Sequence, residues 1–373
     1  MRIAFLCKRQ YMGKDVIADR YARLYEIPSQ LACHGHTVYS FCLSYQGHEE
    51  GSWEHVAPGG KLIWESRSLG HAIVPRLLAY PALLLRRLRE FSPDLIIGAS
   101  DIPHVALAAW AAQKLDTPYA VDLYDNFESF SQARIPGMVG SLRRAVRGAR
   151  LVTTTSEPLK DLVVKEYRAK GEVISMPSTV DKRVFRPLDR AVARRSLGLP
   201  LDARLVGTAG GLHRDKGVDA LYTAWNSIAA RHADAHLVLA GPFDSSFPPP
   251  EHPRIHYLGQ LPHPRTAELF AALDVGVIYL RDTLFGRYCF PQKAYEMMAC
   301  ELPIVAASVG VMPHLLADLP DSLYRPDDAS DLARAVFAQL TTPRLARVAI
   351  DDWAQVIGAV EPKLRALFGI KPA

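Results

Sequence analysis

The chain has 373 residues, of which 49% are hydrophobic and 22% charged, and its formal net charge is +5. This length is more than one hydrophobic core normally supports, so it predicts two domains. The composition excludes a disordered chain. The mild positive charge fits phosphate-bearing ligands or an anionic membrane surface and is too small to indicate nucleic acid binding.

The cysteines and the apolar segments bear on location. Five cysteines without a C-x-x-C pair favour reduced, buried thiols in a cytosolic protein. The first apolar run ends at Cys7, which is too short for a signal peptide. The longest apolar region, residues 72–85, contains Pro75, Arg76 and Pro81 and is shorter than the about 20 residues that span a bilayer. We therefore expect a cytoplasmic protein, with peripheral contact to the inner face of the membrane left open.

The first half of the chain alternates short apolar runs with longer amphipathic stretches. The apolar runs predict strands at residues 3–7, 37–43, 94–98, 119–123, 151–155 and 171–176. Helices are expected at residues 17–33, 77–91 and 105–114. Strands with helices between them predict a parallel, doubly wound α/β sheet.

The pattern then restarts after a charged connecting stretch at residues 178–200. Further strands are expected at residues 205–208, 236–239, 255–257, 275–279 and 304–306, with helices at 220–231 and 266–273 between them. The helical tail is expected to pack back on the first domain. We thus predict one Rossmann-like domain at residues 1–178 plus 352–373 and a second at 179–351, with a cleft between them for a nucleotide ligand.

A glycine-rich segment follows the first strand of the second domain. Gly210 and Gly211 let the backbone approach a diphosphate, and the following helix N-terminus adds N–H groups. Arg214 and Lys216 add full positive charges for leaving phosphates. The spacing is not that of a Walker A loop. An ordinary turn with exposed basic residues is the competing interpretation.

A second segment, residues 290–299, follows the strand at 275–279. Pro291 suits the first position of a helix, whose first-turn N–H groups can hold an anion. Lys293 lies on that turn, and Glu296, one turn later, can accept both hydroxyls of a ribose. A surface Lys–Glu pair on an ordinary helix is the competing interpretation.

In chain order, these segments resemble the donor-binding domain of the family-4 retaining glycosyltransferases, which have the GT-B fold. The resemblance rests on Val180-Asp181 with Phe185 and Pro187, Gly211 to Gly217, residues 236–241 (HLVLAG), residues 255–259 (IHYLG), and residues 291–299 followed by 302–307. The first half fits more loosely, through residues 31–38, 93–97 and 152–159.

The resemblance implies that the second domain binds a nucleotide sugar and the first domain the acceptor. Lys216 matches the family's basic contact to the diphosphate, and Glu296 matches the second glutamate of its E-x7-E motif, which binds the ribose. The remaining implied donor contacts are the backbone around Pro291, Gln292 and Lys293 for the diphosphate or sugar, Gly259 to Leu261 beside the base, and Gly13 closing over the phosphates.

Three positions depart from the family pattern. Tyr288 stands where the first motif glutamate is expected, so the chain follows a P-x-K-x-x-E variant, and Asp282 is the replacement for the sugar contact. Leu212 stands where the family has an arginine, which leaves Arg214 to supply that charge. Glu301 replaces a usual glycine after the helix.

The acceptor side is expected after the strand at residues 119–123, where the family often carries a histidine. Here Asp125 is the candidate to orient or deprotonate the acceptor hydroxyl. An aspartate that forms a turn or caps a helix would give the same sequence pattern. Asp101 and His104 are further acceptor candidates.

A basic stretch follows at residues 134–150. It contains Arg134, Arg143, Arg144, Arg147 and Arg150, with no acidic residue between Glu128 and Glu157. Interleaved Met138, Leu142 and Val146 make it partly amphipathic, which suits an anionic lipid surface and a lipid-linked acceptor. A solvated basic helix explains the pattern equally well.

Taken together, the resemblance implies transfer with retention of configuration, with diphosphate departure assisted by Lys216, Arg214, Lys293 and helix N–H groups. No metal-ligand cluster is visible, so neither metal nor cofactor is expected. Members of the family that the chain resembles commonly use UDP-sugars and act in surface polysaccharide or lipid-linked glycan assembly, so both are expected here. The rivals are a nucleotide-sugar epimerase or hydrolase, a non-catalytic GT-B binding protein, and a dehydrogenase, which would need more than the single glycine in residues 8–15.

Overall fold

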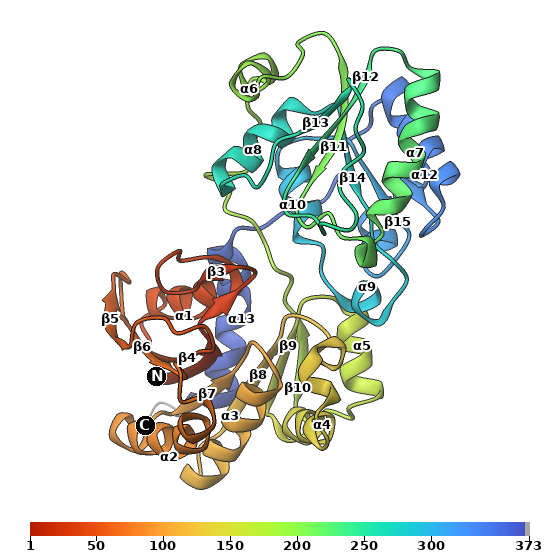
Figure 1. The fold of residues 1–373 in the computed structure, drawn as a ribbon. Helices are drawn as coiled ribbons and strands as arrows, with labels where there is room; N and C mark the ends of the chain where they lie inside the picture. The colour runs from red at the N-terminus through yellow and green to blue at the C-terminus, as the bar shows by residue number, and fades with distance from the viewer. Residues whose placement is uncertain (370–373) are drawn as a thin grey trace. The chain divides into compact units, whose positions relative to one another are not determined.

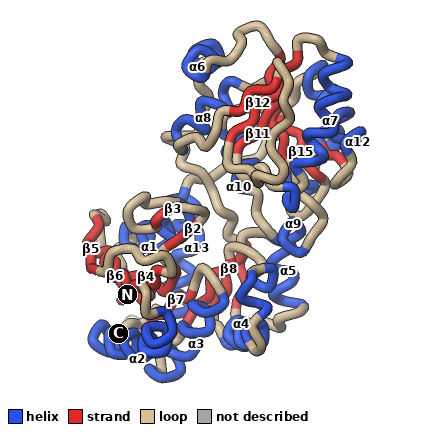
Figure 2. The backbone as a smooth tube through the Cα atoms, viewed as in Figure 1, coloured by secondary structure: helices blue, strands red, loops and turns tan. Residues whose placement is uncertain are grey.

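The computed structural model describes residues 1–369 and divides the chain into two compact units (Figure 1). The first unit holds Met1–Ser178 and the C-terminal segment from Trp353, and the second holds Thr179–Asp352. Figure 2 shows the strands of each unit in red with helices around them. The chain therefore passes from one unit to the other twice, after Ser178 and after Asp352.

The first unit is built on one eight-stranded sheet in the order β10-β9-β8-β7-β1-β4-β6-β5. The strands are β1 (Arg2–Lys8), β4 (Thr37–Ser44), β5 (Gly51–His55), β6 (Lys61–Ser68), β7 (Leu95–Gly98), β8 (Tyr119–Leu123), β9 (Leu151–Thr154) and β10 (Glu172–Ser175). All pairs are parallel except β5 with β6. The prediction of a purely parallel sheet is therefore wrong at this edge, where β5 alternates half-buried and exposed residues.

Helices pack around this sheet. They are α1 (Ala22–Cys33), α2 (Ile73–Phe91), α3 (Ile102–Leu115), α4 (Met138–Gly148), α5 (Glu157–Lys165) and α13 (Trp353–Phe368), with the short turns η1 (Phe127–Ser129) and η2 (Ser131–Arg134). The tail helix α13 packs against α1, and His36 Nε2 lies 2.8 Å from Glu361 Oε1. The returning C-terminal helix is thus confirmed.

Helix α1 begins five residues later than predicted. The preceding residues form a small hairpin, β2 (Gln10–Tyr11) with β3 (Lys14–Asp15). The Asp15 carboxylate then accepts hydrogen bonds from the N–H groups of Ile17 and Ala18, so this segment is a turn.

The second unit has a six-stranded, fully parallel sheet in the order β13-β12-β11-β14-β15-β16. The strands are β11 (Arg204–Ala209), β12 (Ala235–Ala240), β13 (Ile255–Tyr257), β14 (Val275–Ile278), β15 (Ile304–Ala307) and β16 (Leu323–Tyr324). The helices are α6 (Arg190–Leu197), α7 (Val218–Arg231), α8 (His263–Ala272), α9 (Leu284–Tyr288), α10 (Gln292–Ala299), α11 (Met312–Leu315) and α12 (Ala329–Thr341), with η3 (Arg214–Lys216) and η4 (Pro320–Ser322).

Successive strands of this sheet contribute side chains to two separate apolar clusters. Leu205, Val238 and Ile304 belong to one, with α8 and α10, and Val206, Leu237 and Val305 belong to the other, with α7 and α12. Both faces are therefore covered, which confirms the doubly wound arrangement. In the part of the chain that the structure describes, no helix has the length and apolar character needed to cross a bilayer.

Candidate functional site

The order of the strands identifies the edge of the second sheet where a ligand is expected. The chain runs outward from β11 through β12 to β13 and then returns to place β14 on the other side of β11. Ligands of doubly wound sheets bind at the carboxyl ends of the strands where the order reverses. Gly210 and Gly211 directly follow β11 at this point.

The loop after β11 is held close to its neighbour by glycine. Gly241, which follows β12, has φ +124°, and a Cβ there would lie 2.1 Å from the carbonyl oxygen of Gly210. Gly259, after β13, has φ +68°, and its carbonyl oxygen accepts a hydrogen bond from Gly241 N at 2.8 Å. The backbone of three successive loops is thus packed together, and Leu261 lies half-buried beyond them.

Two lysine ammonium groups flank this glycine pair. A Cβ on Gly210 would lie 3.4 Å from Lys293 Nζ, and one on Gly211 would lie 3.2 Å from Lys216 Nζ. Among residues 1–369, neither lysine forms an ion pair with a carboxylate. The His213 ring also covers Gly211, 2.6 Å from such a Cβ, and Glu296 offsets part of the charge of Lys293 without forming an ion pair with it. Two like charges this close form a site that an anion would stabilise.

Lys293 is the more constrained of the two lysines. Its Nζ donates to Thr208 Oγ1 at 3.4 Å and lies 4.7 Å from the centre of the Tyr279 ring. Burial, and then the charge of Lys216, lower the pKa of Lys293 to about 8. A bound anion would reverse this effect, because it would favour the charged ammonium.

Glu296 lies on α10 one turn after Lys293, as predicted. Its carboxylate is only 12% exposed, 3.6 Å from His263 Nε2 and 3.5 Å from Gln292 Nε2. It is therefore held by weak polar contacts, which leaves it able to accept hydrogen bonds from a ligand.

The start of α10 differs from the prediction. Pro291 precedes the helix instead of forming its first residue. The N–H groups of Gln292 and Ala294 donate to the carbonyl oxygens of Phe290 and Pro291, at 2.9 and 2.8 Å. The expectation that these first-turn N–H groups are available to an anion is therefore wrong for both.

Other predicted donor residues lie in different surroundings. The exposed guanidinium of Arg214 packs 5.4 Å from the centre of the Phe247 ring. Asp282 is exposed and forms an ion pair with Arg287, and Tyr288 ends α9 half-buried. The two charges proposed to replace missing family residues are therefore already engaged with other side chains.

Gly13 lies in the first unit, at the tip of the β2–β3 hairpin. Met12 and Gly13 have φ values of 51° and 76°, as two-residue hairpin turns of type I′ require. Gly13 is exposed, and a Cβ there would meet no atom within 4 Å. The turn explains the glycine without a ligand.

The first sheet has its own reversal of strand order, between β7 and β1. Asp125 follows β8 beside this point and is buried, and its Oδ1 accepts a hydrogen bond from Asn126 N at 2.8 Å. Burial raises the pKa of Asp125 to about 7. A carboxyl group that titrates near neutral pH suits acid–base chemistry.

Lys8, at the carboxyl end of β1, was not predicted as a site residue. Its Nζ donates to Tyr124 Oη at 3.2 Å, and its charge opposes the pKa increase of Asp125. A single lysine after a strand has no distinctive motif. Only its place at the carboxyl end of the strand where the order reverses could have identified it.

Asp101 and His104 have structural roles in this arrangement. Asp101 is the N-cap of α3, and its Oδ1 accepts from His104 N at 3.0 Å and lies 2.6 Å from His104 Nδ1. Both side chains are at most 2% exposed. The proposed acceptor contacts of these two residues are therefore corrected to a buried helix cap.

A buried ion pair fixes β8 ahead of Asp125. Arg23 of α1 contacts Asp122 at 2.6 Å, and both side chains are at most 2% exposed. Arg23 also donates to the carbonyl oxygen of Met176, and Thr153 Oγ1 donates to Asp122. These bonds join α1, β8, β9 and the end of β10 beneath the candidate acceptor edge.

Comparison with protein families extends over both units. Residues 22–179 match the glycosyl transferase 4-like domain, and residues 203–342 match the glycosyl transferases of group 1. The two matches together cover most of the chain. Each of the two units therefore matches a glycosyltransferase domain.

Its relatives among characterised proteins are similar over part of their length. The D-inositol 3-phosphate glycosyltransferase of Stackebrandtia nassauensis is 32% identical over 66% of this chain and 57% of its own. The putative teichuronic acid biosynthesis glycosyltransferase TuaC of Bacillus subtilis is 26% identical over 70% of this chain and 65% of its own. The chain thus spans about half to two thirds of the length of the relatives it matches.

Solved structures resemble the chain over nearly all of their length. Sucrose-phosphate synthase of Thermosynechococcus elongatus aligns with a TM-score of 0.75 at 20% identity, covering 99% of both chains. Anabaena HepE in complex with UDP aligns with a TM-score of 0.66 at 16% identity, covering 99% of this chain and 96% of that one. At these identities the likeness is one of fold, and it confirms GT-B.

Most of the basic stretch at residues 134–150 forms α4. Leu142 and Val146 are fully buried, so the apolar side of α4 faces the core of its own domain. Arg143 forms an ion pair with Glu128 at 2.7 Å. The helix is a basic surface without the exposed apolar face that membrane docking by α4 itself would need.

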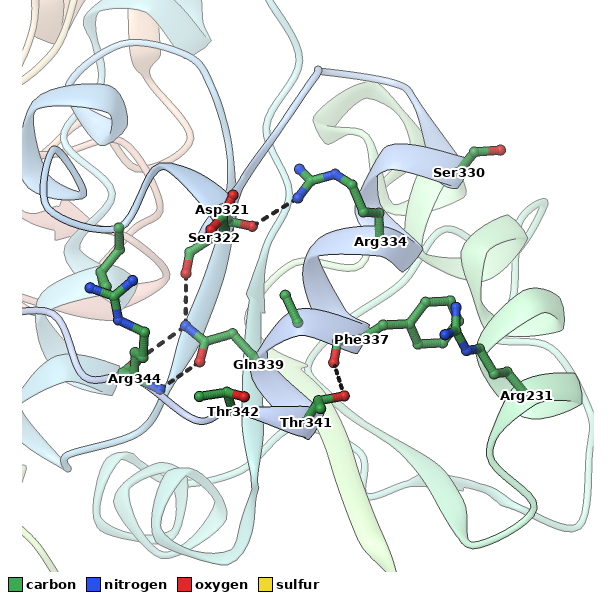
Figure 3. Close-up of a pocket in the computed structure, with 12 residues that line it drawn as sticks. Arg231, Asp321, Ser322, Ser330, Arg334, Phe337, Gln339, Thr341, Thr342 and Arg344 are labelled. Carbon is green, nitrogen blue, oxygen red and sulfur yellow. Dashed lines mark hydrogen bonds between the residues drawn. The ribbon is translucent and has the colours of Figure 1, made fainter.

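A cavity of about 680 Å³ lies at the other edge of the second sheet (Figure 3). Its wall includes Gln339, which donates to the carbonyl oxygen of Ile304, the first residue of β15. Arg231, on the opposite wall, stacks over Phe337. Because this is the amino end of the strands, the cavity is separate from the lysine pair. In residues 1–369, no group of three or more metal-binding side chains comes together.

Proposed function

We propose that this glycosyltransferase binds a UDP-sugar in its second domain and transfers the sugar, with retention of configuration, to a hydroxyl of a glycan or lipid-linked acceptor held by its first domain. The single observation that carries the proposal is the pair Lys216 and Lys293 beside Gly210 and Gly211, without a carboxylate partner among the described residues.

A nucleoside diphosphate would supply the negative charges that the Lys216 and Lys293 pair lacks. Its two negative charges would neutralise both ammonium groups, and the glycines leave room for the phosphate oxygens close to the backbone. Glu296, one turn along α10, is in position to accept the hydroxyls of the ribose. UDP is favoured because HepE, with the same fold, is known in complex with UDP and with UDP-glucose.

The proposed chemistry is positioning and charge stabilisation. Lys216 and Lys293 stabilise the leaving diphosphate, while the acceptor hydroxyl attacks from the same face of the sugar. Asp125, with its pKa of about 7, orients that hydroxyl or takes its proton. Because two ammonium groups carry the charge stabilisation, we propose that transfer needs no metal ion.

The acceptor proposal rests on the relatives' names. One acts in teichuronic acid biosynthesis and others are glycosyltransferases for D-inositol 3-phosphate. A surface polysaccharide or lipid-linked acceptor, reached from the cytoplasmic side, is consistent with the first of these. The inositol phosphate relatives make a small phosphorylated acceptor the alternative to include in any assay.

The test is a transfer assay with UDP-sugars against inositol phosphate, oligosaccharide and lipid-linked acceptors, in the presence and absence of EDTA. We expect acceptor-dependent UDP release unaffected by EDTA, and a product with the donor's anomeric configuration by NMR. Lys216→Ala and Glu296→Ala are expected to abolish transfer, while Lys182→Ala, a surface control, leaves it unchanged. Full activity in both site variants would show that the donor site is wrongly assigned.

One observation favours a second candidate, a GT-B protein that binds the nucleotide sugar without transfer. Two of the three positions that depart from the family pattern have other surroundings here, since Leu212 is buried in the core and Glu301 occupies a left-handed backbone conformation. UDP binding without turnover on any acceptor would support this candidate. Turnover of the donor without an acceptor would instead indicate a hydrolase or epimerase.

A further inference from the structure

The first two turns of α2 carry large apolar side chains that face solvent. Ile73, Val74, Leu77 and Leu78 are 53%, 66%, 46% and 76% exposed. Every residue from 71 to 79 is exposed, and Arg76 holds this end of the helix to the domain through Ser68 and Glu50. Exposed apolar patches of this kind usually mark a surface that contacts an apolar partner.

The exposed residues continue the stripe by which α2 packs on its domain. Tyr80, Leu84, Leu88 and Phe91 are buried and recur at intervals of three or four residues. Ile73 and Leu77 extend the same spacing toward the N-terminus but have no sheet beneath them. The helix therefore has a complete apolar face, of which its own domain covers only the second half.

The helix and the segment before it are basic, although Arg76 is paired with Glu50 and Arg87 with Glu65 and Glu90. Between Glu65 and Glu90 the chain has five arginines and no acidic residue. Arg86 and Arg89 are on the surface of α2 and have no ion-pair partner among residues 1–369. An exposed apolar helix face with unpaired arginines matches the chemistry of an anionic lipid surface.

The start of α2 also lies at the same edge of the sheet as the candidate acceptor site. Arg76 Nη1 donates to the carbonyl oxygen of Ser68, the last residue of β6, so the start of α2 lies at the carboxyl edge of the sheet. Asp125 lies at the same edge, after β8. Also in the segment after β8, Ile135 is 55% exposed and follows Arg134, which has no ion-pair partner among the described residues. Four strand spacings separate β6 and β8, about 19 Å.

We propose that the first two turns of α2 insert into the headgroup region of an anionic membrane and hold the candidate acceptor edge of the first domain at the lipid surface. The contact is interfacial, since the apolar segment is too short to span a bilayer. The proposal goes beyond sugar transfer and does not depend on it, because vesicle binding needs neither donor nor acceptor.

The first experiment is flotation of the full chain with vesicles of phosphatidylcholine alone or mixed in equal parts with phosphatidylglycerol. We expect binding to the mixed vesicles only, weakened by salt. Leu77→Ser with Leu78→Ser is expected to reduce binding at least about tenfold, since apolar burial drives insertion. Val192→Ser with Leu201→Ser, at comparably exposed positions in the second domain, is the matched control and leaves binding unchanged.

A second readout reports insertion itself. Tryptophan placed by Leu78→Trp is expected to be quenched by brominated lipid in the mixed vesicles, whereas tryptophan placed by Leu201→Trp is not. Arg86→Gln with Arg89→Gln is expected to lower affinity for the mixed vesicles about tenfold or more and to reduce its salt dependence. Circular dichroism confirms that each variant is folded.

Two results would overturn the proposal. One is equal vesicle binding by the wild type and the Leu77/Leu78 variant, and the other is absence of binding to anionic vesicles. A change of oligomeric state in the serine variant would assign the face to a second copy of the chain instead. UDP binding, measured in the same variants, is expected to stay unchanged, so failure here is separate from failure of the donor site.

Discussion

Replacing Lys293 by methionine is expected to stabilise the protein and weaken its binding of UDP at the same time. Methionine keeps most of the length of the side chain and removes the ammonium group. That group is packed beside Thr208 and the Tyr279 ring, close to the positive charge of Lys216. In the absence of a ligand, its charge is therefore a cost to the folded state.

The size of the cost follows from the pKa. Lowering the pKa of Lys293 from 10.5 to about 8 corresponds to about 3 kcal/mol, and we expect about 1–3 kcal/mol because the side chain is only half-buried. The unfolded chain binds more protons between these two pKa values, so wild-type stability rises with pH through that window. The full cost is present below pH 8, where Lys293→Met should be the more stable protein.

Binding of a diphosphate reverses the sign of this effect. Near pH 8 about half of the Lys293 side chains are neutral, and a bound anion would restore the proton. We expect uptake of about 0.5 proton per UDP bound, measured by calorimetry in buffers of different ionisation enthalpy. Loss of a charged hydrogen bond in Lys293→Met should weaken binding about 10–100-fold and abolish the uptake.

The assays are urea unfolding from pH 7 to pH 9.5 and calorimetry with UDP, on the wild type and Lys293→Met. Lys182→Met, an exposed lysine of the same domain, is the control and should change neither quantity. The reasoning would be refuted if Lys293→Met were less stable than the wild type at pH 7, or if it bound UDP with the same affinity and proton uptake.

Three further predictions follow from single contacts. Because burial raises the pKa of Asp125 to about 7, activity should fall below pH 7. Asp125→Asn should lower kcat about 10²–10⁴-fold and raise the free energy of unfolding at pH 8. A pH–rate profile that is the same in the wild type and Asp125→Asn would contradict this role. Arg23→Met leaves the Asp122 carboxylate buried and unpaired, and should cost about 3–5 kcal/mol in urea unfolding, much of which the added Asp122→Leu should restore. Glu301→Gly relieves a φ of +55° and should raise stability by about 0.5–1 kcal/mol; a loss of stability would show that the glutamate makes a contact of its own.

The buried parallel strands were the most predictable part of the fold. β8 lies at residues 119–123 as predicted, because short apolar runs between helices have few alternatives in a doubly wound sheet. The edge strand β5 and its neighbour β6 were missed, since β5 is half exposed and β6 ends in polar residues. Helix α6 was missed within the charged stretch at 178–200; Arg194 anchors it by donating to the carbonyl oxygen of Ala272, which no periodicity reveals.

The candidate site was predictable where sequence neighbours decide the geometry. The segments after β11 and around α10 bring Lys216 and Lys293 to the same glycine loop, as their order in the chain suggested. The role of Arg214 depended on a contact with Phe247, from a distant segment, that no spacing along the chain encodes. The role of Asp101 is local, since it caps α3 through His104 three residues later. Lys8 was missed because only the strand order gives it a neighbour in Asp125.

The most direct test of a diphosphate site at Lys216 and Lys293 is calorimetric titration with UDP, GDP, ADP and TDP, repeated with their common sugars. We predict that one nucleotide, UDP, binds tightly with or without magnesium, and that Lys216→Ala loses this binding while Lys182→Ala retains it. Absence of binding by any of these nucleotides, or undiminished binding in Lys216→Ala, would contradict the account.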